Sequence, residues 1–241
     1  MKKSLFILLF AFFFVFSCRK SDSYGTLTGA RTVAEQNSND DAAIKKYMEE
    51  HYFNGQGLVK SYSGTGALPA DFPRLSEHKS TKLPSGVIIV MREGAQPAEG
   101  KGKTIGDTDI IRLMSKTSVF TSGKGKEGKI TYNMKADFEN TIEGSGVPKV
   151  DPYYYYVKKD ILEKNKRTRA YYEIKGFQEG VRYFKSCEIG DEENYNLQGV
   201  IMVPSRAAYG RNDHFTQQYT DASFVFNFQV YKTTPRPEDQ E

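Results

Sequence analysis

The chain has 241 residues, of which 13% are aromatic, with 16 tyrosines, 16 phenylalanines and no tryptophan. This length predicts one domain of ordinary size with extensions, and the aromatic residues suffice to build one core. The formal net charge is +4. Basic and acidic residues are mixed along the chain and form no basic stripe, which argues against nucleic acid as a partner.

Residues 1–17 have the form of a lipoprotein signal peptide. Lys2 and Lys3 precede an apolar run that is too short to span a membrane and ends at the small residue Ser17. The stretch VFSC, which ends at Cys18, resembles a bacterial lipobox, in which the cysteine becomes acylated. Each buried acyl methylene contributes about 0.8 kcal/mol, so several chains hold a protein on a lipid membrane. We expect anchoring through Cys18 in the bacterial cell envelope, either periplasmic or surface-exposed; the alternative is a plain signal peptide with an incidental cysteine.

Residues 18–39 are predicted to form a flexible tether, because they are polar and contain few large apolar side chains. An N-terminal helix and loop follow over residues 40–80. Ile44, Tyr47, Met48 and His51 recur at spacings of three and four, which places them on one helix face. We expect Asn39 or Asp40 to cap this helix and Gly55 to end it.

Strand patterns dominate after residue 80. Apolar runs or alternation predict strands over residues 85–94, 106–120, 128–138, 197–203 and 222–232. The run DPYYYYVKKDI, residues 151–161, is read as a further strand with two tyrosine rings on each face. Phe177, Val181 and Phe184 fit one face of a short helix over residues 176–184. We therefore expect an α+β domain with a mostly antiparallel sheet, and a disordered charged tail at residues 236–241.

Several catalytic signatures are absent or incomplete. The stretch GKGKEGKI resembles a phosphate-binding loop, but Ile130 replaces the required Ser or Thr and a strand is predicted to follow. His51, His78 and His214 are far apart and have no ligand partners at zinc spacing, so no metal or other cofactor is expected. If Cys18 is acylated, Cys187 is left without a disulfide partner and is read as a small buried apolar residue.

A family resemblance emerges in the second half of the chain. YEIKGFQEGVRYF, IMVPSRAAYGRNDHF and SFVFNFQVYK together are similar to the core of an FKBP-type peptidyl-prolyl cis/trans isomerase. The upstream stretch SGVIIVMREGAQPAEGKGKTIGDTDI resembles the opening of that domain. The resemblance implies an FKBP-like domain over residues 81–235, with an antiparallel sheet wrapped around a short helix.

The resemblance also implies roles for particular side chains in a proline-binding cleft. Phe177 stands where the family usually has a tryptophan floor, and the backbone N–H of Ile174 would bind the substrate carbonyl. Tyr209 would point its hydroxyl into the cleft. His214 and Phe226 follow Tyr209 at the family's separations.

The cleft's remaining wall is assigned by the same resemblance. Tyr153 resembles a wall phenylalanine, and Glu143 stands where the family has an aspartate after an aromatic residue, with Ile142 in the aromatic position. The partners implied are proline-containing peptides or protein clients.

Three departures from the family pattern concern catalysis. Tryptophan becomes Phe177, the aspartate becomes Glu143, and residues 217–219 replace an apolar pair with QQY. Residues 160–172 also resemble an insertion. Two functions therefore stay open: an envelope-anchored prolyl isomerase or folding helper that acts on X-Pro bonds of exported proteins, or a non-catalytic FKBP-like lipoprotein that serves as a binding or scaffold module.

Overall fold

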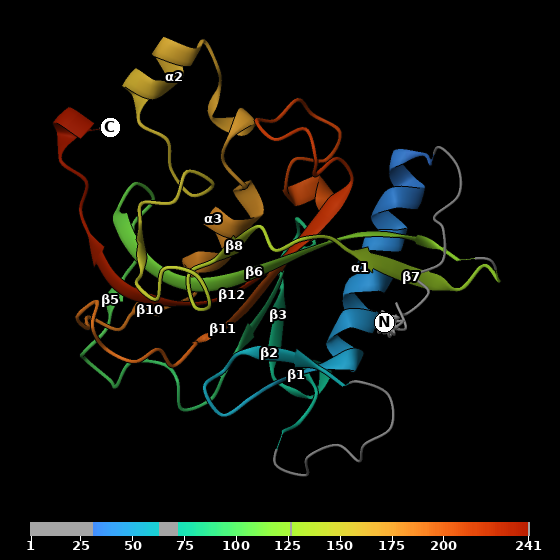
Figure 1. The fold of residues 1–241 in the computed structure, drawn as a ribbon, viewed down its shortest axis with the longest axis horizontal. Helices are drawn as coiled ribbons and strands as arrows, with labels where there is room; N and C mark the ends of the chain where they lie inside the picture. Colours follow the sequence, from blue (N-terminus) through green and yellow to red (C-terminus); the bar gives the residue numbers. More distant parts are fainter. Residues whose placement is uncertain (1–30, 63–71, 126, 241) are drawn as a thin grey trace, which may run out of the picture.

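A computed structural model describes residues 31–62, 72–125 and 127–240 of the chain. The predicted signal peptide at residues 1–17, the lipidation site Cys18 and the tether up to residue 30 lie outside the described residues. The described part is an α+β fold built on a curled antiparallel sheet (Figure 1). The predicted α+β class is confirmed.

The main sheet has the strand order β3-β4-β11-β12-β6-β7, and the short strands β8 and β9 also pair with β6. All of these pairings are antiparallel. The long central pair consists of β6, Ile110–Lys124, and β12, Ala222–Thr234. The other bounds are Ser80–Lys82 for β3, Ile88–Met91 for β4, Ile130–Met134 for β7, Glu139–Asn140 for β8, Lys149–Val150 for β9 and Gly199–Val203 for β11.

Smaller elements surround the main sheet. Two separate strand pairs are formed by β1, His51–Phe53, with β2, Val59–Ser61, and by β5, Lys103–Thr104, with β10, Lys185–Ser186. The α-helices are α1, Val33–Glu50, α2, Lys159–Asn165, and α3, Lys175–Val181. Short 3-10 turns are η1, Leu75–Glu77, η2, Arg169–Tyr171, η3, Ser205–Ala207, and η4, Glu238–Gln240. Among the described residues, no helix is both long enough and apolar enough to cross a bilayer.

The two faces of the sheet carry separate cores. On one face, α3 packs against the sheet with Phe177 and Val181, and alternate residues of β12 contribute Phe224, Phe226 and Phe228. On the other face, α1 packs with Ile44, Tyr47 and Met48. We call these the α3 face and the α1 face; Figure 1 shows the two helices on different sides of β6 and β12.

Glycines allow α3 to lie close to the sheet. A Cβ atom on Gly176 would come within 2.5 Å of a Val203 methyl, and one on Gly180 within 2.6 Å of an Ile201 methyl. These two glycines are four residues apart and therefore share one helix face. The predicted helix at residues 176–184 is confirmed as α3, and the predicted strands at residues 85–94, 106–120, 128–138, 197–203 and 222–232 are confirmed as β4, β6, β7, β11 and β12, with shifted bounds.

The prediction of a tether up to residue 39 is wrong for its last seven residues, because α1 begins at Val33. Thr32 and Glu35 form a capping box: the Glu35 N–H donates to the Thr32 hydroxyl at 3.1 Å, and the Thr32 N–H donates to the Glu35 carboxylate at 2.9 Å. Asn39 and Asp40, the predicted caps, are buried in the middle of the helix. The helix ends at Glu50, before the expected Gly55, and the predicted loop that follows contains β1, β2 and η1.

Asp40 explains how a polar helix face can be buried. Its carboxylate accepts hydrogen bonds from the Ser205 N–H at 3.0 Å, the Ser205 and Ser122 hydroxyls at 2.5 Å each, and the Gln36 amide at 2.7 Å. Buried charges are tolerated when such donors surround them. Apart from Gln36, these donors come from β6 and η3, far away in sequence, so the local pattern could not reveal them.

The predicted strand at residues 151–161 is also wrong. Asp151 adopts a left-handed conformation with φ 51°, and the N–H groups of Tyr155 and Tyr156 both donate to the Pro152 carbonyl. The chain therefore turns here, and Tyr154, Tyr155 and Tyr156 are all buried. We call residues 151–158 the tyrosine segment.

The tail was predicted to be disordered, and this is wrong for residues 236–240. Strand β12 continues to Thr234, Arg236 is buried, and η4 follows it.

Candidate functional site

Aromatic residues from four parts of the chain meet on the α3 face. The Phe177 ring of α3 lies 4.5 Å from Phe226 of β12, measured between ring centroids. Tyr209 stacks on His214 at 4.6 Å, and Phe224 joins the two pairs, at 5.9 Å from Tyr209 and 5.8 Å from Phe226. Four side chains that the resemblance assigns to a cleft therefore belong to one aromatic cluster.

The tyrosine segment closes this cluster. Tyr153, the predicted wall residue, is half-buried and lies 4.6 Å from Phe215. Its neighbour Tyr154 is fully buried, with its ring 5.4 Å from both Phe177 and Phe226. Phe177 and Phe226 have no exposed surface, so the Tyr154 ring occupies the space in front of the expected floor.

Two polar groups that the resemblance assigns to the substrate already have partners in this chain. The Ile174 N–H donates to the Tyr154 carbonyl at 2.7 Å. The Tyr209 hydroxyl donates to the Tyr172 carbonyl at 2.8 Å, and burial raises its pKa well above the usual value. Tyr172 belongs to the predicted insertion at residues 160–172, so that insertion and the tyrosine segment satisfy both donors.

His214 is held by its own loop. Its Nδ1 lies 2.9 Å from the Asn212 carbonyl, and its Nε2 accepts the Tyr219 N–H at 3.1 Å. These partners require a neutral imidazole with the proton on Nδ1. The ring has no exposed surface, so His214 shapes the loop behind Tyr209 and does not face solvent.

The assignment of Glu143 is wrong, because this side chain lies outside the cluster. It pairs with Lys116 at 2.8 Å on the surface, and the hydrogen bond from Lys116 holds its carboxyl pKa below the usual range. Ile142 packs in another core with Met114.

Phe138, a few residues before Glu143, contributes an aromatic ring to the cluster. Its ring lies 5.3 Å from Tyr154, 5.1 Å from Phe224 and 6.5 Å from Phe226. Glu139 follows it, so DFEN at residues 137–140 supplies an aromatic residue followed by an acid. That dipeptide was the signal that could have found this position.

Buried hydroxyls without hydrogen bonds gather in the same core. Ser115 and Thr117 alternate along β6 and so lie on one face, which also carries Leu113 and Val119 of the α3-face core. Their hydroxyls, and that of Tyr154, are buried and make no well-formed hydrogen bond to the described residues, although those of Ser115 and Tyr154 lie near each other. Burial raises the Tyr154 pKa far above its usual value, with the charge of Glu139 adding to the shift and the Ser115 hydroxyl opposing it. Unsatisfied polar groups of this kind cost free energy, so Tyr154 fills the cluster imperfectly.

Glu173 fastens the tyrosine segment to α3. Its carboxylate accepts the Val157 N–H at 2.8 Å, an Arg169 guanidinium N–H at 2.9 Å and the Gln178 amide at 3.0 Å. Gln178 also donates to the Tyr155 carbonyl at 2.6 Å. The segment that closes the cluster is therefore fixed on its inner side by several charge-assisted bonds.

A separate surface hollow of about 610 Å³ lies beside α3. Its lining includes the charged side chains of Arg169, Lys175, Glu179 and Arg206, and neither Phe177 nor Tyr209 contributes to it. Within residues 31–62, 72–125 and 127–240, no group of three or more His, Cys, Asp or Glu side chains is placed to hold a metal ion. Cys187 is half-buried, and its burial raises the thiol pKa.

The comparisons with known proteins add no relative. No protein-family model matches the chain, and no curated protein matches it.

Proposed function

We propose that this protein is a lipid-anchored protein of the bacterial cell envelope whose FKBP-like domain binds proline-containing segments of exported proteins, without constitutive isomerase activity. The anchor is proposed from residues 1–18. The binding role is supported by the convergence of Phe177, Tyr209 and Phe226, which the resemblance assigns to a prolyl site.

The observation that carries the absence of constitutive catalysis is the internal use of the two donors. A prolyl isomerase must favour the twisted amide over both planar forms, and a thousandfold acceleration needs about 4 kcal/mol of that preference. Fixed donors aimed at the substrate are one source of such preference. Here the Ile174 N–H and the Tyr209 hydroxyl are bonded to Tyr154 and Tyr172, so a substrate must displace both carbonyls before it gains anything.

The second candidate is an isomerase that acts after the tyrosine segment has moved. The aromatic cluster itself favours this candidate, because an apolar environment disfavours the charge-separated planar amide. No nucleophile or metal is required, since rotation about the X-Pro bond breaks no covalent bond.

The two candidates can be separated by refolding a test protein whose slow phase is limited by proline isomerisation. We expect the wild-type chain to leave that rate unchanged while a known prolyl isomerase accelerates it. Binding of an X-Pro peptide, followed by NMR shifts of Tyr209 and Phe224, should be weak in the wild type. It should strengthen in Tyr154→Ala, which removes the ring that fills the site.

The matched control is Phe228→Ala, which removes a buried ring of the same core, 5.9 Å from Phe177, but leaves Tyr154 in place. This variant should not gain peptide affinity. Acceleration of refolding by the wild type would replace our proposal with constitutive isomerisation. Failure of both the wild type and Tyr154→Ala to bind any X-Pro peptide would exclude a prolyl ligand for this site.

A further inference from the structure

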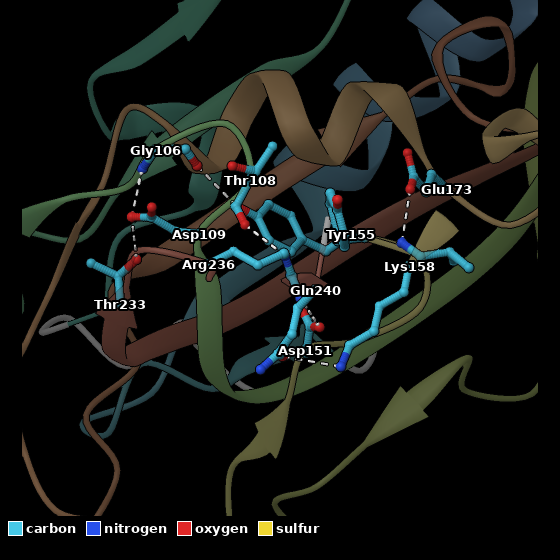
Figure 2. A network of polar contacts seen from close by, with 12 residues as sticks. Gly106, Thr108, Asp109, Asp151, Tyr155, Lys158, Glu173, Thr233, Arg236 and Gln240 are labelled. Carbon is cyan, nitrogen blue, oxygen red and sulfur yellow. Dashed lines mark hydrogen bonds and ion pairs between the residues drawn. The ribbon is translucent and has the colours of Figure 1, made fainter. Parts of the chain in front are cut away.

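The C-terminal residues cross over the outer side of the tyrosine segment. In residues 235–240, which we call the strap, only Arg236 is buried, and its side chain has no exposed surface. Its guanidinium makes two bonds to the Asp151 carboxylate, at 2.5 and 2.8 Å, and its Nε donates to the Thr108 carbonyl at 2.8 Å (Figure 2). It also lies over the Tyr156 ring, 3.7 Å from the centroid. A single side chain thus carries an ion pair, a backbone contact and a cation–π contact.

The rest of the strap is held weakly. Gln240 accepts a hydrogen bond from Lys158 at 3.1 Å, and the remaining side chains are exposed. Pro235 and Pro237 flank Arg236 and restrict the backbone on both sides, which lowers the entropy lost when the strap docks. The strap is therefore preorganised for docking but depends on one anchor.

The strap begins at a firmly held point. Thr233, near the end of β12, donates to Asp109 at 2.9 Å, and Asp109 also accepts the Gly106 N–H at 2.9 Å (Figure 2). The Tyr155 hydroxyl donates to the Gly106 carbonyl at 3.0 Å. The loop at residues 106–109 thus connects the end of β12 to the tyrosine segment, and motion of the strap is confined to the residues after Thr234.

Asp151 is the other half of the anchor, and it starts the tyrosine segment. Its φ of 51° precedes Pro152, a position where non-glycine residues rarely adopt a helical or left-handed backbone. Its conformation is supported by the Arg236 ion pair and by its N–H bond to the Ile111 carbonyl at 2.9 Å. Loss of Arg236 would leave a partly buried carboxylate without its cation, beside a strained turn.

We infer that the strap is a latch: docking of Arg236 on Asp151 holds Tyr154 inside the aromatic cluster, and its release uncovers the Ile174 N–H and the faces of Phe177 and Phe226. This inference rests on the proposed function, because the uncovered groups are those assigned to the prolyl ligand. Tyr154 is suited to leave, since its hydroxyl makes no well-formed hydrogen bond to the described residues, with only the Ser115 hydroxyl close enough to oppose the rise of its pKa, and it gains hydrogen bonds in water.

Hydrogen exchange tests the latch without any ligand. In Arg236→Gln, and in a chain that ends at Thr234, exchange of the Ile174 amide should accelerate about tenfold or more, while amides of β11 should keep their wild-type rates. Arg236→Lys keeps the charge but loses the two-pronged contact, so an intermediate acceleration is expected. The matched control is Arg206→Gln, which breaks a long-range ion pair with Asp41 on the α1 face and should leave the Ile174 amide unchanged.

Peptide binding then separates the latch from the proposed function. Arg236→Gln and the chain that ends at Thr234 should each bind an X-Pro peptide at least about tenfold more tightly than the wild type, a difference of about 1.4 kcal/mol in binding free energy. Unchanged exchange at Ile174 in both variants, or acceleration shared equally by β11, would overturn the latch. Local acceleration without any gain in peptide affinity would keep the latch and reject the prolyl ligand.

Discussion

The Asp40 cluster on the α1 face and the Tyr154 cluster on the α3 face treat buried polar groups in opposite ways. On the α1 face, the Asp40 carboxylate is fully buried and accepts four hydrogen bonds from three residues. On the α3 face, the hydroxyls of Ser115, Thr117 and Tyr154 are just as deeply buried but make no hydrogen bond to the described residues. The contrast lies between these two clusters and not between the whole faces, because the Gln36 side-chain oxygen and the Ser223 hydroxyl on the α1 face are also buried without a hydrogen bond to the described residues. A cluster that secures a helix is expected to satisfy its polar groups, whereas several unsatisfied groups together mark a place where another arrangement competes.

The strongest way to break this comparison is Asp40→Ala. Removing the carboxylate leaves the N–H of Ser205 and two hydroxyls buried without an acceptor, so the free energy of unfolding should fall by about 3 kcal/mol or more. Urea denaturation measures this loss. The neighbouring Asp41 is half-exposed and pairs with Arg206, so Asp41→Ala should cost less than about 1 kcal/mol. Equal losses in the two variants would show that the Asp40 cluster is not what secures α1.

A smaller effect is expected from Tyr209→Phe on the α3 face. The variant loses one hydrogen bond to the Tyr172 carbonyl and should be destabilised by about 1 kcal/mol in thermal or urea unfolding. Tyr183 is half-exposed, and Tyr183→Phe should be unchanged. If the stability of Tyr209→Phe is also unchanged, the hydrogen bond from the Tyr209 hydroxyl to Tyr172 does not hold residues 160–172 against the cluster.

The smallest effect separates two serines on the same strand. Ser115→Ala removes an unsatisfied hydroxyl and should leave the free energy of unfolding within about 0.5 kcal/mol of the wild type, or raise it. Ser122 also lies on β6 and is equally buried, but its hydroxyl donates to Asp40. Ser122→Ala should therefore cost about 2 kcal/mol. A loss for Ser115→Ala as large as that for Ser122→Ala would show that the two clusters do not differ.

Much of this fold was predictable, because apolar periodicity is local. Strands β4, β6, β7, β11 and β12 and helix α3 were predicted from runs or alternation of apolar residues. The first turns of α1 were missed because Gln36, Asn39 and Asp40 look like a solvated segment. The serines that donate hydrogen bonds to Asp40, Ser122 and Ser205, come from β6 and η3. Arg236 was missed for a similar reason: a charged residue between two prolines is typical of a tail, and its partner lies 85 positions earlier.

The residues of the candidate site were predictable only in part. The family resemblance brought together Phe177, Tyr209, His214 and Phe226, and the structure places all four in one cluster. Glu143 was assigned from a short motif, which can be aligned at several positions, and Phe138 and Glu139 were not considered. The closure by Tyr154 could not be foreseen, since four consecutive tyrosines fit a strand and only the turn at Pro152 buries three of them together.

The position of β12 in the sheet also constrains when the domain can form. Among the described strands it is the last to be synthesised, yet it lies between β11 and β6 and joins the two halves of the sheet. Until residue 234 has been made, β3, β4 and β11 can pair only with one another, and β6 only with β7, β8 and β9. These two small sheets lack the strand that joins them and the Phe224, Phe226 and Phe228 side chains of the α3-face core, so each is at best marginally stable. Contacts this distant in sequence form slowly. We therefore expect the domain to stay unfolded during its synthesis and to acquire its core in one late step, with Arg236 docking only after β12 is in place.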